Sequence, residues 1–94
     1  MSMSGLSLSA LAVLHELATK GPMTPKQIRQ EVTLSPRSVS DALRRLSTRH
    51  LCKKVPNLSD MRQPLYCVES IKMKELHISL PQIRAMTSIY LKVV

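Results

Sequence analysis

The sequence predicts a mainly helical fold of the α+β class, in which a small β-hairpin follows three helices and a further helix lies near the C-terminus. Three observations indicate this fold. A serine or threonine followed within two positions by a proline occurs at residues 24, 35 and 79, which is the pattern of a capped helix start. Apolar residues then recur at helical spacing. Two short candidate strands, LCKKV at 51–55 and LYCV at 65–68, flank a polar, turn-rich segment at 56–63, as in a hairpin.

The first helix is expected to begin near Ser7 or Ser9, since both are good N-caps, and to end at Gly21, which a proline follows. Residues 1–6 are expected to be a flexible N-terminus. Helical spacing predicts a single buried face, made of Ala10, Val13, Leu14, Leu17 and Ala18, with Leu11 beside it.

Two further helices follow in close succession. Thr24 and Gln27 have the spacing of a capping box, so a short helix is predicted at 25–32. Ser35 repeats the cap before a proline and opens a third helix that extends to about residue 49. Two helices joined by so short a connection have the dimensions of a helix-turn-helix.

The third helix has two distinct faces on a helical wheel. One face is apolar and contains Val39, Ala42, Leu43 and Leu46. The other face is polar and contains Arg37, Asp41, Arg44 and Thr48, with Ser38, Ser40 and Arg45 at its flanks. The helix is therefore expected to bury one side and to present a continuous polar surface on the other.

The C-terminal part contains a third capped start and a segment that the pattern leaves open. Ser79, Pro81 and Gln82 predict a helix start. The segment 69–78 is ambiguous, because Leu76, Ile78 and Leu80 also alternate as in a strand. An apolar stripe follows, made of Ile83, Met86, Ile89, Tyr90 and Val93. This stripe could pack on the chain's own domain or form the seam of a dimer, and we favour the dimer seam.

Charge and composition narrow the class of partner. The chain has 94 residues, enough for one domain, and a net charge of +8. Between residues 26 and 62, nine basic residues face only three acidic ones, so this stretch favours an anionic partner. Stacking aromatics are nearly absent, with two tyrosines and no Phe or Trp, which disfavours single-stranded nucleic acid. The longest apolar run, 10–14, is too short to span a membrane.

The reactive side chains show no catalytic or metal-binding pattern, so we expect no enzyme activity and no cofactor. The sequence has no paired-carboxylate site, glycine-rich phosphate loop or nucleophile with a recognisable base, and its three histidines lack ligand spacing. Cys52 and Cys67 would be cross-strand neighbours in a hairpin symmetric about residues 59 and 60, where a disulfide is geometrically feasible. Two free thiols are the expected state.

Three motifs follow one another along the chain, TPKQIRQEVTLSPRSVSDALRRL (24–46), HLCKKV (50–55) and NLSDMRQPLY (57–66). In this order they resemble the MarR-like winged helix-turn-helix transcription regulators, especially short archaeal-type members. The resemblance covers about half of the chain. It implies a recognition helix at 35–49 in the major groove and a wing at 56–64 on the minor groove. It also implies that Asp60 and Arg62 match the family's D-x-R, in which the arginine reaches the minor groove and the aspartate braces the wing.

The resulting hypothesis is a sequence-specific regulator that binds double-stranded DNA as a homodimer in the cytoplasm, at the nucleoid. The alternative is a winged-helix module that binds protein within a transcription or replication assembly. The expected organisation is a winged helix-turn-helix domain at 7–69 and a C-terminal helical extension at 70–94 that serves as a candidate dimerisation element. The candidate DNA-binding residues are Lys26, Ser35, Pro36, Arg37, Ser38, Ser40, Asp41, Arg44, Arg45, Lys53, Lys54 and Arg62.

One alternative applies to the third helix. The polar face of the third helix could be a solvated surface with Arg37–Asp41 and Asp41–Arg45 pairs at i,i+4. The chain is also shorter than many MarR-like proteins, and nothing in it clearly builds a pocket for a small-molecule effector. Dimer geometry and effector response are therefore open.

Overall fold

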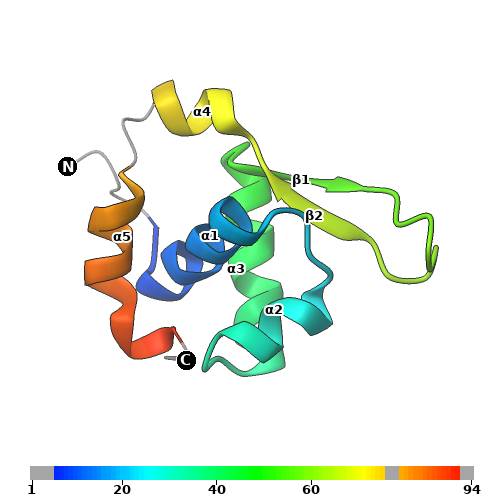
Figure 1. Ribbon diagram of the computed structural model, residues 1–94, viewed down its shortest axis with the longest axis horizontal. Helices are drawn as coiled ribbons and strands as arrows, with labels where there is room; N and C mark the ends of the chain where they lie inside the picture. The colour runs from blue at the N-terminus through cyan, green and yellow to red at the C-terminus, as the bar shows by residue number, and fades with distance from the viewer. Residues whose placement is uncertain (1–5, 76–78, 92–94) are drawn as a thin grey trace.

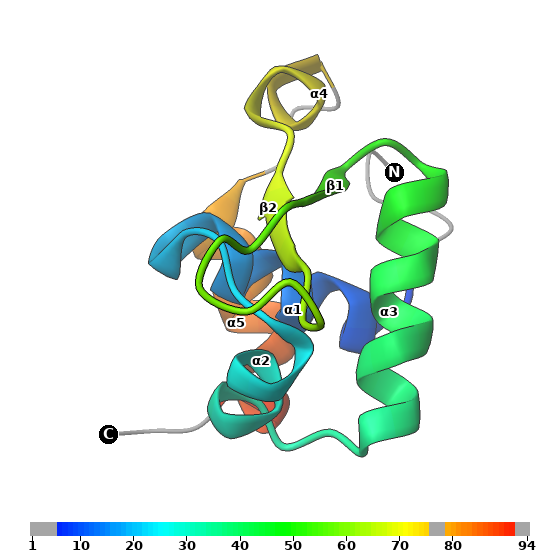
Figure 2. The ribbon, with the colours of Figure 1, turned by 90° about the vertical axis from the view of Figure 1, so that its right-hand side faces the viewer.

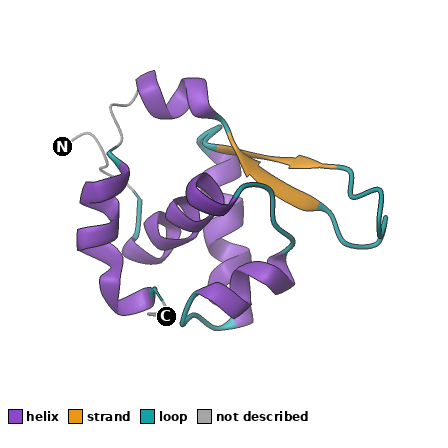
Figure 3. Ribbon diagram, viewed as in Figure 1, coloured by secondary structure: helices purple, strands orange, loops and turns teal. Residues whose placement is uncertain are grey.

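The computed structural model describes residues 6–75 and 79–91. Along the chain, the elements are α1 (Leu8–Lys20), α2 (Pro25–Glu31), α3 (Pro36–Thr48), β1 (Cys52–Val55), β2 (Leu65–Val68), α4 (Ser70–Glu75), α5 (Leu80–Thr87) and the 3-10 helix η1 (Ser88–Tyr90). The predicted class is confirmed, because helices dominate and the two strands form one antiparallel hairpin (Figures 1 and 3).

The predicted helix caps are confirmed, and they explain where each helix begins. The hydroxyls of Ser7, Ser35 and Ser79 each accept a hydrogen bond from a backbone N–H three residues later. Thr24 forms a complete capping box with Gln27, in which the Thr24 hydroxyl accepts from the Gln27 N–H and the Gln27 side chain accepts from the Thr24 N–H. These bonds satisfy N–H groups that lack a partner in the first helical turn.

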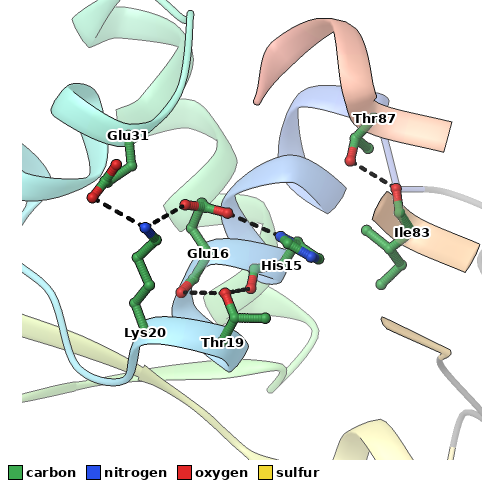
Figure 4. Close-up of polar contacts among 7 residues, drawn as sticks. All are labelled: His15, Glu16, Thr19, Lys20, Glu31, Ile83 and Thr87. Atoms are coloured by element: carbon green, nitrogen blue, oxygen red, sulfur yellow. Dashed lines mark hydrogen bonds and ion pairs between the residues drawn. The ribbon is translucent and has the colours of Figure 1, made fainter. Parts of the chain in front are cut away.

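Helix α1 is the centre of the core, and the prediction of a single buried face was wrong. All eight residues from Ala10 to Leu17 are buried, because α3, α5 and β2 pack around the helix (Figure 1). Even His15 and Glu16 are only 6% and 5% exposed. The spacing of apolar residues predicted one buried and one polar face, whereas neighbouring elements also cover the polar side, where Glu16 lies toward Glu31 of α2 (Figure 4).

The hairpin register differs by one residue from the symmetric arrangement. Cys52 pairs with Val68 and Lys53 pairs with Cys67, so the turn is centred on Asp60. Since successive residues of a strand point to opposite faces, a shift of one residue places the two thiols on opposite faces. The expectation that the cysteines are cross-strand neighbours was therefore wrong, and both are free thiols in the structure.

The hairpin is attached to the helix-turn-helix through a short backbone bridge. The N–H of Met23 donates to the carbonyl of Tyr66 at 3.0 Å, and the N–H of Tyr66 donates to the carbonyl of Met23 at 2.8 Å. Met23 lies directly before α2, so the strand β2 is tied to the segment that leads into α2. Figure 2 shows the resulting arrangement, with α3 on one side of the hairpin and α2 at its foot.

The C-terminal part packs on the same core. The segment 69–78, whose pattern was ambiguous in the sequence, forms the helix α4 over Ser70–Glu75, while residues 76–78 lie outside the described residues. On α5, Ile83 and Thr87 are fully buried, whereas Met86 is 38% exposed, and Ile89 on η1 is 73% exposed. The predicted apolar stripe is thus divided between two directions, and Val93 lies outside the described residues. Ile83 belongs to the chain's own core and is not available to a dimer seam.

We expect Gly21→Ala to lower the free energy of unfolding by about 1–3 kcal/mol. Gly21 ends α1 with φ +85° and ψ −164°, a backbone conformation that is essentially restricted to glycine. An added Cβ would meet no atom within 4 Å, so backbone strain alone should set the loss. Urea denaturation followed by circular dichroism measures the change.

His50→Gly is the matched control, because His50 also has a positive φ, of 60°. Glycine adopts this conformation without strain, so this variant should unfold at the same urea concentration as the wild type or a higher one. Equal destabilisation by both substitutions would contradict the assignment of strain to Gly21→Ala.

Candidate nucleic-acid interface

The exposed face of α3 is the first part of the candidate surface. Val39, Ala42, Leu43 and Leu46 are buried, as predicted, so the opposite side of the helix faces outward. This outer side forms a shallow hollow lined by Arg37, Ser38, Ser40, Asp41 and Arg44. All five residues were among the candidates from the sequence, and the structure brings them together on one face.

Asp41 organises the charges on this face. Its Oδ1 accepts from Arg44 Nη2 at 2.7 Å and its Oδ2 accepts from Arg45 Nε at 2.9 Å. The hydrogen bonds from Arg45 and Arg44 lower the pKa of Asp41 below its ordinary value of 3.8. The Asp41–Arg45 pair was anticipated, whereas the alternative Arg37–Asp41 pair is not formed. Within the part of the chain that the structure describes, Arg37 makes no hydrogen bond or ion pair, so its guanidinium remains available to a ligand.

The N-terminus of α3 lies at one end of the same face. Ser35 accepts from the Ser38 N–H at 3.1 Å, and its hydroxyl also donates to the Ser38 hydroxyl at 3.0 Å. Pro36 occupies the first helical position. Both serine hydroxyls therefore serve the cap first, while the positive end of the helix dipole faces the exposed surface.

A second hollow connects α3 with the hairpin. It shares Ser40 and Arg44 with the first hollow and continues across β1 and β2, and its lining consists of Pro25, Ser40, Leu43, Arg44, Ser47, Cys52, Lys53, Lys54 and Tyr66. The polar face of α3 and the basic strand β1 thus form one continuous surface.

The two lysines of this hollow are held differently. Lys53 Nζ lies 2.9 Å from Glu69 Oε1, and this hydrogen bond raises the pKa of the lysine. Lys54 Nζ lies 5.8 Å from the centroid of the Tyr66 ring, within reach of a cation–π contact. Sequence reasoning missed Ser47 and Tyr66. Ser47 is seven residues after Ser40 and thus on the same side of the helix, while Tyr66 could be assigned only once the strand register was known.

The tip of the hairpin is an ordered turn built around Asp60. Oδ1 of Asp60 accepts from the Arg62 backbone N–H at 3.1 Å and from Arg62 Nε at 3.2 Å, and Oδ2 accepts from Gln63 Nε2 at 3.1 Å. The bonds from Arg62, first the backbone one, lower the pKa of Asp60. The carboxylate thereby braces the turn, while the Arg62 side chain stays 90% exposed. Leu58 and Met61, which flank this aspartate, are 88% and 71% exposed.

The remaining candidates are less closely connected with this surface. Lys26 is exposed on α2. On the candidate dimer surface, Met86 and Ile89 are exposed and Tyr90 is half-buried.

A charged cluster, in which His15 and Glu16 are buried while Lys20 and Glu31 reach the surface, lies away from this surface and joins α1 to α2 (Figure 4). His15 Nδ1 lies 2.9 Å from Glu16 Oε2, and Lys20 Nζ lies 3.8 Å from Glu16 Oε1 and 3.2 Å from Glu31 Oε1. The side chains of this cluster thus serve as hydrogen-bond and ion-pair partners for one another. Within residues 6–75 and 79–91, no three His, Cys, Asp or Glu side chains are grouped to hold a metal ion, and no helix combines the length and apolar content needed to cross a membrane.

The sequence matches a known family model over most of this surface. The model described as the MarR family matches residues 6–63, which is more than half of the chain and extends from α1 into the tip of the hairpin. No curated protein sequence matches the chain.

Solved structures of similar fold give a consistent comparison. A protein described as a "probable transcriptional regulator" from Pseudomonas aeruginosa has a TM-score of 0.73 at 20% identity, covering 93% of this chain and 68% of its own. A variant of ZitR from Lactococcus lactis gives 0.72 at 22% identity, with 94% and 61% covered. BpsR from Bordetella bronchiseptica, whose DNA binding is regulated by 6-hydroxynicotinic acid, gives 0.75 at 19% identity, with 90% and 61% covered. The chain thus spans about three fifths to two thirds of the length of these proteins.

Acidification should loosen the tip of the hairpin. Because the pKa of Asp60 is lowered from 3.8, its carboxylate favours the ordered turn above that pH, and this contribution is lost as the pH falls through the lowered pKa. Backbone NMR relaxation from about pH 6 to about pH 2.5 should show residues 57–63 becoming mobile below 3.8 while core signals such as that of Val13 persist.

Asp60→Asn serves as the control for this titration. It removes the titrating group, so its tip should already be mobile at about pH 6 and change little with acidification. A wild-type tip whose mobility stays constant down to the lowest pH would contradict the bracing role of the carboxylate.

Proposed function

The chain belongs to the MarR family of winged-helix transcription regulators, and from this premise we propose that it binds double-stranded DNA sequence-specifically and regulates transcription by occupying promoter sites. The observation that carries the proposal is the continuous basic surface formed by the outer face of α3 and the hairpin, on which Arg37 has no hydrogen bond or ion pair with any described residue. Helix 35–49 enters the major groove, and the wing at 56–64 lies on the minor groove. Such a regulator acts in the cytoplasm, at the nucleoid.

The exposed face of α3 suits base recognition. The major groove of B-DNA is about 12 Å wide and admits an α-helix. An arginine can bind guanine O6 and N7 through two hydrogen bonds, and such a pair discriminates against the wrong base by about 1–3 kcal/mol. Arg37 lies in the first turn of α3 and is exposed, so it is the leading candidate for this contact. Arg44 must exchange its bond with Asp41 for one with the base.

The hairpin contributes positive charge on the other side of α3. Arg62 is highly exposed at the tip, where it can enter a narrow minor groove, whose negative potential attracts arginine. Lys53 and Lys54 on β1 are exposed and provide phosphate contacts. Such contacts position a protein on the duplex without reading its sequence.

The active form that we propose is a homodimer. Met86 and Ile89 offer exposed apolar area on the C-terminal part, and a twofold dimer would place two recognition helices in half-sites about one helical turn apart. Ile83 has no part in this surface, because it is fully buried.

A protein-binding module remains the second candidate, and one observation favours it. Leu58 and Met61 at the hairpin tip are exposed apolar side chains, which a protein partner could bury. Binding of a protein through the hairpin tip would leave the basic surface on α3 without a function.

One titration separates the two functions. Fluorescence anisotropy of a labelled random duplex is measured against salt concentration, and a DNA-binding chain should lose affinity with a log–log slope of about −0.9 per neutralised phosphate. Negligible binding at low salt would instead give the protein-binding module the lead.

Arg37→Ala and Arg62→Ala should weaken binding in different ways once an operator has been selected from a random library. Arg37→Ala should reduce the preference for the operator over random duplex by about fivefold or more, because its partner is a base edge. Arg62→Ala should weaken binding to most duplexes. Affinities for operator and random DNA, measured by anisotropy, give both quantities.

Arg84→Ala is the matched control, since Arg84 is an exposed arginine on α5, away from α3 and the hairpin. It should leave both affinities within about twofold of the wild type, apart from its small contribution to net charge. Equal losses on operator and random DNA for Arg37→Ala would refute its contact with a base edge, and a loss confined to the operator for Arg62→Ala would refute its sequence-independent role.

Ile89→Lys should shift the chain towards monomers, because a charge on the exposed apolar surface near the C-terminus must be buried in the dimer. Sedimentation equilibrium should show a dimer dissociation constant raised by about tenfold or more. Ile71→Lys is the matched control, as Ile71 is equally exposed, at 74%, but lies on α4. A wild-type chain that sediments as a monomer would exclude the proposed dimer, and a dimer unaffected by Ile89→Lys would exclude this surface.

A further inference from the structure

The connection between α2 and α3 is held by a segment from the other end of the chain. The backbone N–H of Thr33 donates to the carbonyl of Tyr90 at 2.8 Å. The hydroxyl of Thr33 donates to the carbonyl of Ile89 at 3.2 Å, across 56 positions of sequence. Val32 also forms an antiparallel bridge with Leu91. We call residues 88–91 the C-terminal strap.

The strap satisfies a group that the helix-turn-helix leaves without a partner. Val32 ends α2 in an extended conformation, with φ −124° and ψ 152°, so the next N–H, that of Thr33, has left the hydrogen-bond ladder of the helix. The first N–H groups of α3 are served by the Ser35 cap, which acts only from residue 35 onward. Thr33 therefore depends on Tyr90 for its backbone bond.

The strap is itself anchored in the core. It follows α5, where Ile83 and Thr87 are fully buried and the Thr87 hydroxyl donates to the Ile83 carbonyl at 2.7 Å. Leu91 packs against the same core at the end of the strap. Because α5 and η1 both pack on α1, the strap links the connection before α3 to the centre of the molecule.

We propose that Thr33 is a positioning residue for DNA binding, through which the C-terminal strap fixes the direction in which α3 leaves the turn. This inference rests on the proposed function. The Ser35 cap fixes where the helix begins, whereas the backbone angles of residues 32–34 fix its tilt relative to α2, and the strap restrains those angles. A helix of 13 residues is about 20 Å long, so a tilt of about 10° moves its far end by about 3 Å, a shift as large as a hydrogen bond is long.

The test compares Thr33→Val with Thr33→Ser. Valine keeps the β-branched shape and removes the hydroxyl, while serine keeps the hydroxyl, so serine should restore what valine loses. We expect Thr33→Val to weaken duplex binding by about three- to tenfold and Thr33→Ser to stay within about twofold of the wild type.

Thr19→Val is the matched control. Thr19 is also an exposed threonine whose hydroxyl donates to a backbone carbonyl, that of His15 at 2.8 Å, but this bond lies within α1. Its removal should leave duplex affinity within about twofold of the wild type, since it does not restrain the turn before α3.

Hydrogen–deuterium exchange gives a second readout that needs no DNA. Thr33→Val should speed exchange of the hydrogen-bonded amides of Thr33 and Ser38, whereas Thr19→Val should not. Unchanged exchange at these amides, or unchanged duplex affinity in a Thr33→Val chain that remains folded, would overturn the positioning role while the proposed function stands. A wild-type chain that does not bind duplex DNA would overturn the proposed function, and the positioning role with it.

Discussion

The structure depends on the enclosure of α1. A chain without Phe or Trp must build its core from aliphatic side chains, which bury less area each than aromatic ones. It does so by surrounding one helix with α3, β2 and α5, so that a single apolar segment serves three interfaces. The helix that presents the candidate DNA-binding surface and the helix next to the C-terminus consequently share one support. Burial of Leu11, Leu14 and Leu17 holds the functional and the C-terminal parts of the chain in a fixed relation.

Some arginines of the outer surface form ion pairs with a neighbouring aspartate, whereas Arg37 forms none with the described residues. Asp41 and Asp60 each bind arginines close in sequence, which orders the side chains on α3 and at the hairpin tip. Neither carboxylate is buried, so these bonds are weak enough to be exchanged for contacts with a phosphate or base. Arg37 has no such partner among the described residues. The surface therefore combines preformed positions with one guanidinium that requires no prior exchange, an arrangement that limits the entropy lost on binding.

Local signals made much of the fold predictable, and long-range packing accounts for the errors. The cap at Ser35 and the polar face behind it depend on neighbours within one helical turn, so the sequence alone located the helix that carries the candidate site. The register of the hairpin depends on the geometry of its turn, which is centred on Asp60, and it therefore differs by one residue from the register expected from the sequence. The choice of Arg44 over Arg37 by Asp41 depends on side-chain rotamers, as both lie within helical reach. Tyr66 joined the site only because two elements meet there.

The hairpin register also determines which cysteine thiol is open to oxidation. Cys52 is buried, and burial raises the pKa of its thiol, so little of the reactive thiolate is present there. Cys67 is half-buried on the opposite face of the same hairpin. An internal disulfide would require the strands to slip by one residue, which would turn every side chain of the moving strand to the other face. Oxidation of the folded chain is therefore directed to Cys67 and to products formed with external thiols.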